Sequence, residues 1–169
     1  MAMTSRPWDG AGDLRLMQDL VSASWLAQRP LVNCTAGDLE WWLTNNPSAA
    51  SPETVRLWFD DSELAGWAWL EPPASLDWHL RADLRGGPVH DELLDWLAAR
   101  AGEAIAGGQR LERLRVWVMD ADTATRSLLA ERGYRAGTTT LRHWIHQPGG
   151  SAATGRPERL SGAPRALAG

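Results

Sequence analysis

Three consecutive segments, residues 54–59, 64–71 and 75–82, place apolar side chains at every second position, which is the pattern of β-strands. An Asp-Asp-Ser sequence at 60–62 separates the first two segments and is typical of a tight turn. A Pro-Pro pair at 72–73 ends the second segment. Strands joined so closely pair with their neighbours, so the sequence predicts an antiparallel meander at the centre of the fold.

Helical spacing, capping residues and strand patterns predict the elements around this meander. We expect strands at 4–8, 114–119 and 138–146. We expect helices at 11–27, from a capping box of Thr35 and Asp38 to the Asn-Asn-Pro at 45–47, from the end of a loop at 83–88 to Gly107-Gly108, and from Asp122 or Thr123 to Arg132. A meander followed by β-α-β crossovers favours an α/β (α+β) fold. The expected sheet is mixed but mainly antiparallel, with six to seven strands and about four flanking helices.

The composition excludes several classes of function. All 17 basic residues are Arg, so a P-loop, a Schiff-base site and a lysine base are excluded. A net charge of −4 disfavours nucleic acid as a partner. Cys34 is the only cysteine, which excludes a disulfide framework and a cysteine-rich metal site. Since no apolar run reaches membrane-spanning length, we expect no membrane partner and a cytoplasmic protein.

Two further features concern origin and domain organisation. Eleven Trp stand against one Tyr and one Phe, a bias that we attribute to a GC-rich bacterial genome. The chain divides near Pro148. We expect one folded domain over residues 1–147, and a flexible tail or linker rich in Pro, Gly, Ala and Arg over 148–169.

Two local patterns point to one family. Residues 80–90 read Leu-Arg-Ala-Asp-Leu-Arg-Gly-Gly-Pro-Val-His, and resemble the Val-x-Pro-x-x-Arg-Gly-x-Gly-x-Gly loop of the GNAT acetyltransferases. Residues 122–134 resemble the family's Asn-x-x-Ala-x-x-Leu-Tyr-Glu-x-x-Gly-Phe segment, with Leu128, Glu131, Gly133 and Tyr134 in a similar frame. The resemblance covers about residues 4–146 and, with the order of elements, implies a GNAT-like fold.

The resemblance also implies a ligand and a reaction. Backbone N–H groups of a glycine-containing turn at a helix N-terminus bind the pyrophosphate of acetyl-CoA. The acetyl group then passes directly to the primary amine of a small molecule or peptide, without a metal. The residues placed at the cofactor by this resemblance are Leu80, Ala82, Arg85, Gly86, Gly87, Val89, His90 and Asp122.

Four side chains are candidates for proton transfer. Glu71, Asp77 and His79 lie near the ends of the second and third meander strands, where the family's reacting amine is bound, and each is a candidate general base. Each is alternatively a solvent-facing strand residue or part of a cross-strand pair. Tyr134 is a candidate proton donor or CoA contact, or else a core aromatic residue. His143 and His146 point to opposite faces of a strand, so they predict no metal site.

The chain also departs from the family pattern. Pro88 has no N–H to donate, His90 replaces a glycine, and Leu129 stands at the position of the frequent general-acid tyrosine. These departures keep a second hypothesis open: a catalytically inactive GNAT-like module that binds acyl-CoA or a protein, similar to the first half of a tandem-GNAT protein. A gap between the fourth and fifth strands would argue against a third reading, an α/β domain without CoA function. A homodimer is a further expectation.

Overall fold

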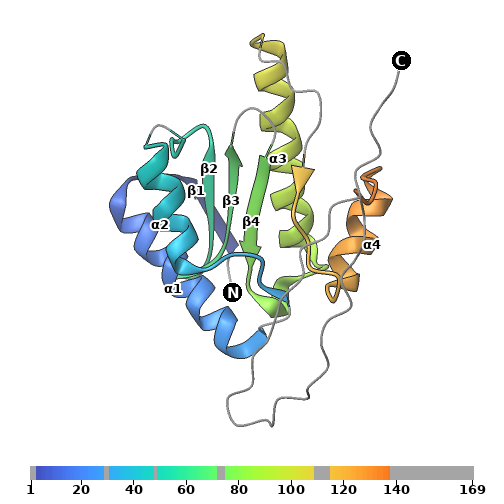
Figure 1. The fold of residues 1–169 in the computed structure, drawn as a ribbon, viewed down its shortest axis with the longest axis horizontal. Helices are drawn as coiled ribbons and strands as arrows, with labels where there is room; N and C mark the ends of the chain where they lie inside the picture. The colour runs from blue at the N-terminus through green and yellow to red at the C-terminus, as the bar shows by residue number, and fades with distance from the viewer. Residues whose placement is uncertain (1–2, 29–30, 48, 72–74, 109–114, 138–169) are drawn as a thin grey trace, which may run out of the picture. The chain divides into compact units, whose positions relative to one another are not determined.

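The computed structural model describes residues 3–28, 31–47, 49–71, 75–108 and 115–137. In chain order the elements are β1 (Met3–Pro7), α1 (Ala11–Gln28), α2 (Ala36–Asn45), β2 (Val55–Asp60), β3 (Glu63–Glu71), β4 (Ser75–Leu80), the 3-10 turn η2 (Ala82–Leu84), α3 (Pro88–Ala106), β5 (Arg115–Val116) and α4 (Thr123–Glu131). Figure 1 shows their arrangement. Within the described ranges, no helix is both long enough and apolar enough to cross a membrane.

The described strands form one sheet in the order β1-β2-β3-β4-β5. β1 to β4 pair antiparallel, and β5 pairs parallel with β4. The predicted α/β class and the mixed, mainly antiparallel sheet are therefore confirmed. Five strands lie within the described residues where six to seven were expected. The strand expected at 138–146, the two histidines within it and the expected tail at 148–169 lie outside the described residues.

The predicted meander forms, and its first strand carries buried side chains on both faces. The β2–β3 turn falls at the Asp-Asp-Ser sequence, where Asp61 has a φ of 54°. Trp58 lies on the face opposite Val55 and Leu57, as the alternation predicts, and is only 1% exposed. Both faces of the sheet are covered, so both sets of alternating side chains are buried and polarity does not distinguish the faces.

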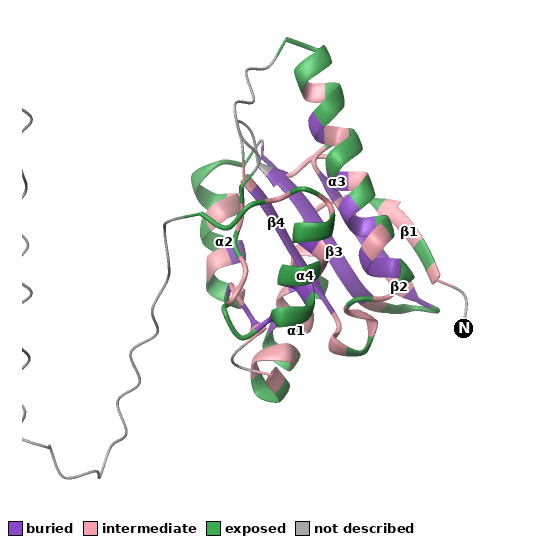
Figure 2. Cartoon of the chain, turned by 90° about the vertical axis from the view of Figure 1, so that its right-hand side faces the viewer, coloured by how far each residue is buried: buried purple, intermediate pink, exposed green. Residues whose placement is uncertain are grey.

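Each face of the sheet carries its own hydrophobic core. α1 and α2 cover one face, and α3 and α4 lie on the other (Figures 1 and 2). The first core contains Met17 and Val21 of α1, Leu39 of α2, and Trp67 and Trp69 of β3. The second core contains Trp58, Leu70, Trp78 and Leu80 of the sheet, Leu93 and Leu97 of α3, and Leu129 of α4. The sheet is therefore a middle layer between two layers of helices.

The capping box that was predicted to open α2 is present. The Asp38 N–H donates to Thr35 Oγ1 at 3.2 Å, and the Thr35 N–H donates to Asp38 Oδ2 at 2.7 Å. We expect Thr35→Ala to lower the free energy of unfolding by about 1 kcal/mol, because it leaves a helix-end N–H without its acceptor. Urea denaturation measures the difference. Thr35→Ser, which keeps the oxygen, is the control, and an alanine variant as stable as the serine variant contradicts the assignment.

Candidate functional site

The sheet opens between β4 and β5. Pairing of the two strands is limited to Ser75 with Arg115 and Leu76 with Val116. β4 continues to Leu80, whereas the chain after Val116 leaves the sheet, so β5 is shorter than the expected strand at 114–119. We call the space where residues 77–80 part from residues 117–119 the β4–β5 opening. The gap between the fourth and fifth strands that the GNAT resemblance implies is present.

A glycine-containing turn stands at one end of this opening. Gly86 has a φ of +74°, a conformation that glycine adopts without strain. Gly87 is the N-cap of α3, and Pro88 occupies the first helical position. The structure thus brings Arg85, Gly86 and Gly87 together before the N-terminus of the longest helix, as the sequence predicted.

The backbone amides of this turn are mostly engaged within the chain. The Gly86 N–H donates to His90 Nδ1 at 3.0 Å, and the Gly87 N–H donates to the Leu84 carbonyl at 3.2 Å. Pro88 has no N–H. Of the amides at 86–89, that of Val89 is the one left without an acceptor among the described residues.

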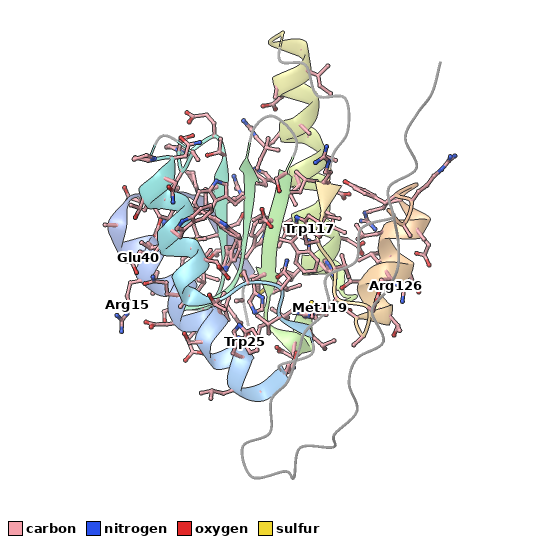
Figure 3. All side chains as sticks on the ribbon, viewed as in Figure 1. Arg15, Trp25, Glu40, Trp117, Met119 and Arg126 are labelled. Carbon is pink, nitrogen blue, oxygen red and sulfur yellow. The ribbon has the colours of Figure 1, made fainter. Side chains whose placement is uncertain are left out.

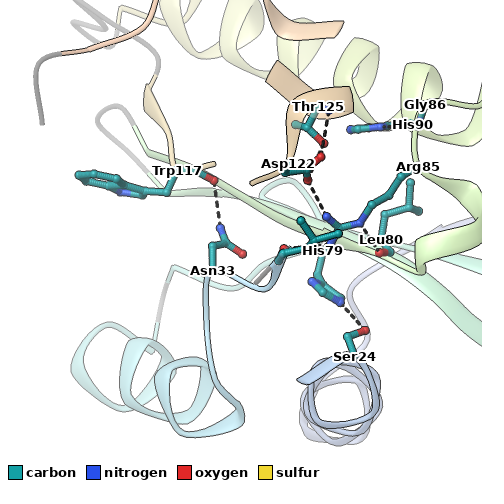
Figure 4. Close-up of polar contacts among 11 residues, drawn as sticks. Ser24, Asn33, His79, Leu80, Arg85, Gly86, His90, Trp117, Asp122 and Thr125 are labelled. Carbon is teal, nitrogen blue, oxygen red and sulfur yellow. Dashed lines mark hydrogen bonds and ion pairs between the residues drawn. The ribbon is translucent and has the colours of Figure 1, made fainter. Parts of the chain in front are cut away.

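Arg85 reaches across the β4–β5 opening (Figure 4). Its side chain is 8% exposed, and its Nη1 donates to Asp122 Oδ2 at 2.6 Å. Its Nη2 donates to the Leu31 carbonyl at 3.2 Å, and its Nε donates to the Leu80 carbonyl at 3.3 Å. One guanidinium therefore joins the end of β4, the segment before α2 and the start of α4.

A second contact crosses the opening nearer to the surface. Asn33 Nδ2 donates to the Trp117 carbonyl at 3.2 Å (Figure 4). Figure 3 labels Trp117 and Met119 on the segment that follows β5. The pocket that remains has a volume of about 10 Å³, which is room for roughly one water molecule. Its lining residues are Leu31, Asn33, Trp78, Arg85, Trp117, Val118, Met119 and Asp122.

Two buried ring nitrogens near the Gly86 turn, Trp78 Nε1 and His90 Nε2, have no hydrogen-bond partner among the described residues. The Trp78 and His90 rings lie 4.6 Å apart. His90 Nδ1 accepts from Gly86, so His90 Nε2 carries the ring proton. Together with the Arg85 guanidinium and the Val89 N–H, these donors fit an anionic ligand rich in acceptors, such as the pyrophosphate of acetyl-CoA.

The predicted proton-transfer residues Asp77 and His79 lie on the face of β4 that is opposite Trp78 and Leu80 and is covered by α1 and α2. Cross-strand pairing places His79 beside Trp67 and Asp77 beside Trp69. His79 is 1% exposed, and its Nε2 lies 2.7 Å from Ser24 Oγ of α1. Burial lowers the pKa of His79 to about 3, with a smaller contribution from the Arg85 charge. His79 is therefore a neutral imidazole at physiological pH.

The other residues considered for proton transfer or nucleophilic chemistry lie outside β4. Glu71 is the last residue of β3, but its side chain lies outside the described residues. Tyr134 is partly buried against the core beneath α3, and this burial raises its pKa. Leu129 belongs to the same core. Burial raises the pKa of Cys34 to about 12, so its thiol is protonated and is not a ready nucleophile.

Sequence reasoning missed three contributors to this region: Ser24, Leu31 and Asn33. Ser24 belongs to α1, and the other two lie in the segment between α1 and α2. Leu31 contributes only a backbone carbonyl, and Asn33 acts through a contact with Trp117, 84 residues away in the chain. No local sequence pattern reports such contacts.

The geometry is that of an α/β domain in which a glycine-containing turn and a helix N-terminus lie beside two separating strands. Solved structures with similar folds include several acetyltransferases. The chain is similar to a ribosomal-protein-alanine N-acetyltransferase from Brucella melitensis biovar Abortus 2308, with a TM-score of 0.56 and 14% identity, covering 86% of this chain and 100% of that one. It is also similar to a GNAT-family acetyltransferase from Streptococcus pneumoniae, with a TM-score of 0.53 and 17% identity, covering 78% and 83%.

A third similar structure is a predicted acetyltransferase from Clostridium acetobutylicum with acetyl-CoA, at a TM-score of 0.56 and 11% identity, covering 84% of this chain and 96% of that one. No protein-family model and no curated protein matches the sequence. The chain has the GNAT fold, as its motifs predicted. Within the described ranges, no group of three or more His, Cys, Asp or Glu side chains is placed to hold a metal ion.

Proposed function

We propose that this chain is an acetyl-CoA-dependent N-acetyltransferase that acts on a primary amine of a small molecule or peptide. The observation that supports the proposal most strongly is the β4–β5 opening in front of the Gly86 turn and the α3 N-terminus. That arrangement gathers hydrogen-bond donors where a pyrophosphate would be held. The net charge of −4 suits a cationic amine as the acceptor.

Each group has a defined task in this proposal. Arg85 and the Val89 N–H hold the phosphates, and the Leu80 and Ala82 backbone flanks the pantetheine arm. Bound acetyl-CoA supplies an activated acetyl thioester. Asp77 is the carboxylate closest in sequence to His79 and shares its face of β4, so it is our candidate for accepting the amine proton. His79, neutral and bound to Ser24, positions the acceptor side of the site.

Ligand-dependent thermal unfolding tests this function. Acetyl-CoA at ten times its Kd should stabilise the chain by about 1.4 kcal/mol, a rise in Tm of roughly 3–6 °C for a domain of this size. Release of free thiol from acetyl-CoA in the presence of a panel of primary amines then measures transfer. The absence of both a Tm shift and thiol release at millimolar acetyl-CoA contradicts the proposal.

A second candidate function is supported by different residues. Leu129 has no proton to donate and is buried, Pro88 offers no N–H, and the Gly86 N–H is already bound to His90. These features favour a GNAT-fold module that binds acyl-CoA or a protein without turnover. A Tm rise with acetyl-CoA and with free CoA, but no thiol release with any amine, distinguishes this module from an enzyme.

A further inference from the structure

The Arg85–Asp122 ion pair occupies the place where the proposed ligand's charge would be neutralised. Arg85 is the cationic side chain at the Gly86 turn, and it is directed towards Asp122 (Figure 4). Both side chains are almost fully buried, with exposures of 8% and 7%. A guanidinium held this way by a carboxylate is not available to a phosphate, because both anions need the same N–H groups.

Asp122 is held in place by a second task. As the N-cap of α4, its Oδ1 accepts from the Thr125 N–H at 3.1 Å, and its Oδ2 accepts from Thr125 Oγ1 at 2.8 Å. Asn caps a helix about as well as Asp. An asparagine here would therefore keep the cap while removing the charge that holds Arg85. The family pattern often has Asn at this position, so the carboxylate is a departure from that pattern.

A second acceptor, the imidazole of His90, engages a donor of the Gly86 turn. Its Nδ1 accepts a hydrogen bond from the Gly86 N–H at 3.0 Å. The family pattern has glycine at the position of His90. His90 is fully buried, and its ring packs on Trp78. Two internal acceptors, a carboxylate and an imidazole nitrogen, thus satisfy two donors of the proposed anion site.

We propose that Asp122 is an intramolecular competitor of the ligand: its carboxylate binds Arg85 in place of the pyrophosphate and keeps the β4–β5 opening closed. This inference rests on the proposed function and deepens it. Ligand binding and the Arg85–Asp122 pair exclude each other. Binding therefore requires Arg85 to leave Asp122 and the Leu31 carbonyl, which separates the segment before α2 from the start of α4.

Calorimetric titration of the full chain with acetyl-CoA and with free CoA tests the competition. We expect Asp122→Asn to lower the Kd at least roughly tenfold, because a desolvated charge pair no longer has to be broken. Asp122→Ser, which also caps a helix, is the second variant in case the first folds poorly. The control is Asp83→Asn, which removes the same charge from an exposed pair with Arg81 and should change the Kd by less than about threefold.

Hydrogen exchange without ligand supplies an independent readout. Backbone amides of residues 31–34 and 117–121 should exchange faster in Asp122→Asn than in the wild-type chain or in Asp83→Asn. Equal Kd values for Asp122→Asn and Asp83→Asn overturn the competitor role while leaving the proposed function intact. If no variant binds acetyl-CoA or CoA at millimolar concentration, the proposed function fails and the competitor role fails with it.

Discussion

Acidification from pH 6.5 to pH 4 is expected to remove on the order of 5 kcal/mol from the free energy of unfolding, because two buried histidines resist protonation. Burial lowers the pKa of His79 to about 3 and that of His90 to about 4. An ordinary histidine in an unfolded chain has a pKa of about 6.5. At a pH between the folded and the unfolded pKa of each histidine, the unfolded chain binds a proton at that residue and the folded chain does not.

The two histidines stabilise the folded chain less as the pH falls. Stability from both residues is fully present above pH 6.5 and is lost as the pH falls, at up to about 1.4 kcal/mol per pH unit for each. The pKa of Asp13 is also lowered in the folded chain, but that carboxylate titrates below this window. A loss of this size is comparable with the whole stability of many domains, so we expect cooperative acid unfolding above pH 4.

Urea denaturation at pH 7, 6, 5 and 4.5 measures this dependence. His90→Asn offers an amide oxygen to the Gly86 N–H and does not titrate, so it should reduce the slope by about half. His79→Asn is the matched variant on the other face of the sheet. An unfolding free energy that stays constant between pH 6.5 and 5 contradicts the assignment of two neutral buried imidazoles.

Replacement of Arg85 by alanine should be among the most destabilising single changes in the chain, at about 3–5 kcal/mol. It leaves the Asp122 carboxylate buried without its counter-charge, and it removes the N–H donors that satisfy the Leu31 and Leu80 carbonyls. Arg15→Ala, in an exposed pair with Asp19, is the control and should cost less than about 0.5 kcal/mol.

A double-mutant cycle isolates the pair itself. Arg85→Ala combined with Asp122→Ala should cost less than the sum of the two single variants, because neither buried charge is then left alone. Denaturant titration of the four proteins gives the coupling energy. Equal costs for Arg85→Ala and Arg15→Ala, or strict additivity in the cycle, contradict the description of Arg85 as a buried, paired cation.

The elements that sequence analysis predicted correctly depend on local signals. The strand–turn–strand pattern around 60–62, the Thr35–Asp38 capping box and the long helix between the loop at 83–88 and Gly107 are each encoded within a short stretch of chain. The position of the Gly86 turn before α3 followed from the same kind of signal. Local chemistry therefore predicts where the framework of the site lies.

The closed state of the site depends on contacts that no local pattern records. Arg85 and Asp122 are 37 residues apart in the chain, and Arg85 and Leu31 are 54 apart. The family resemblance places Arg85 and Asp122 separately at the cofactor, and the structure joins them to each other. The burial of Trp58 has a similar origin, because the helices that cover its face of the sheet come from elsewhere in the chain.

The β4–β5 opening also has a consequence for association between molecules. Where a strand loses its neighbour, its backbone N–H and C=O groups become a template for the strand of another chain. Here the edge of β4 is shielded by side chains, with Arg85 bound to the Leu80 carbonyl and Asn33 fixed to the segment that follows β5. Any event that frees Arg85 also uncovers a strand edge, so we expect a groove that becomes open without a ligand in it to favour self-association.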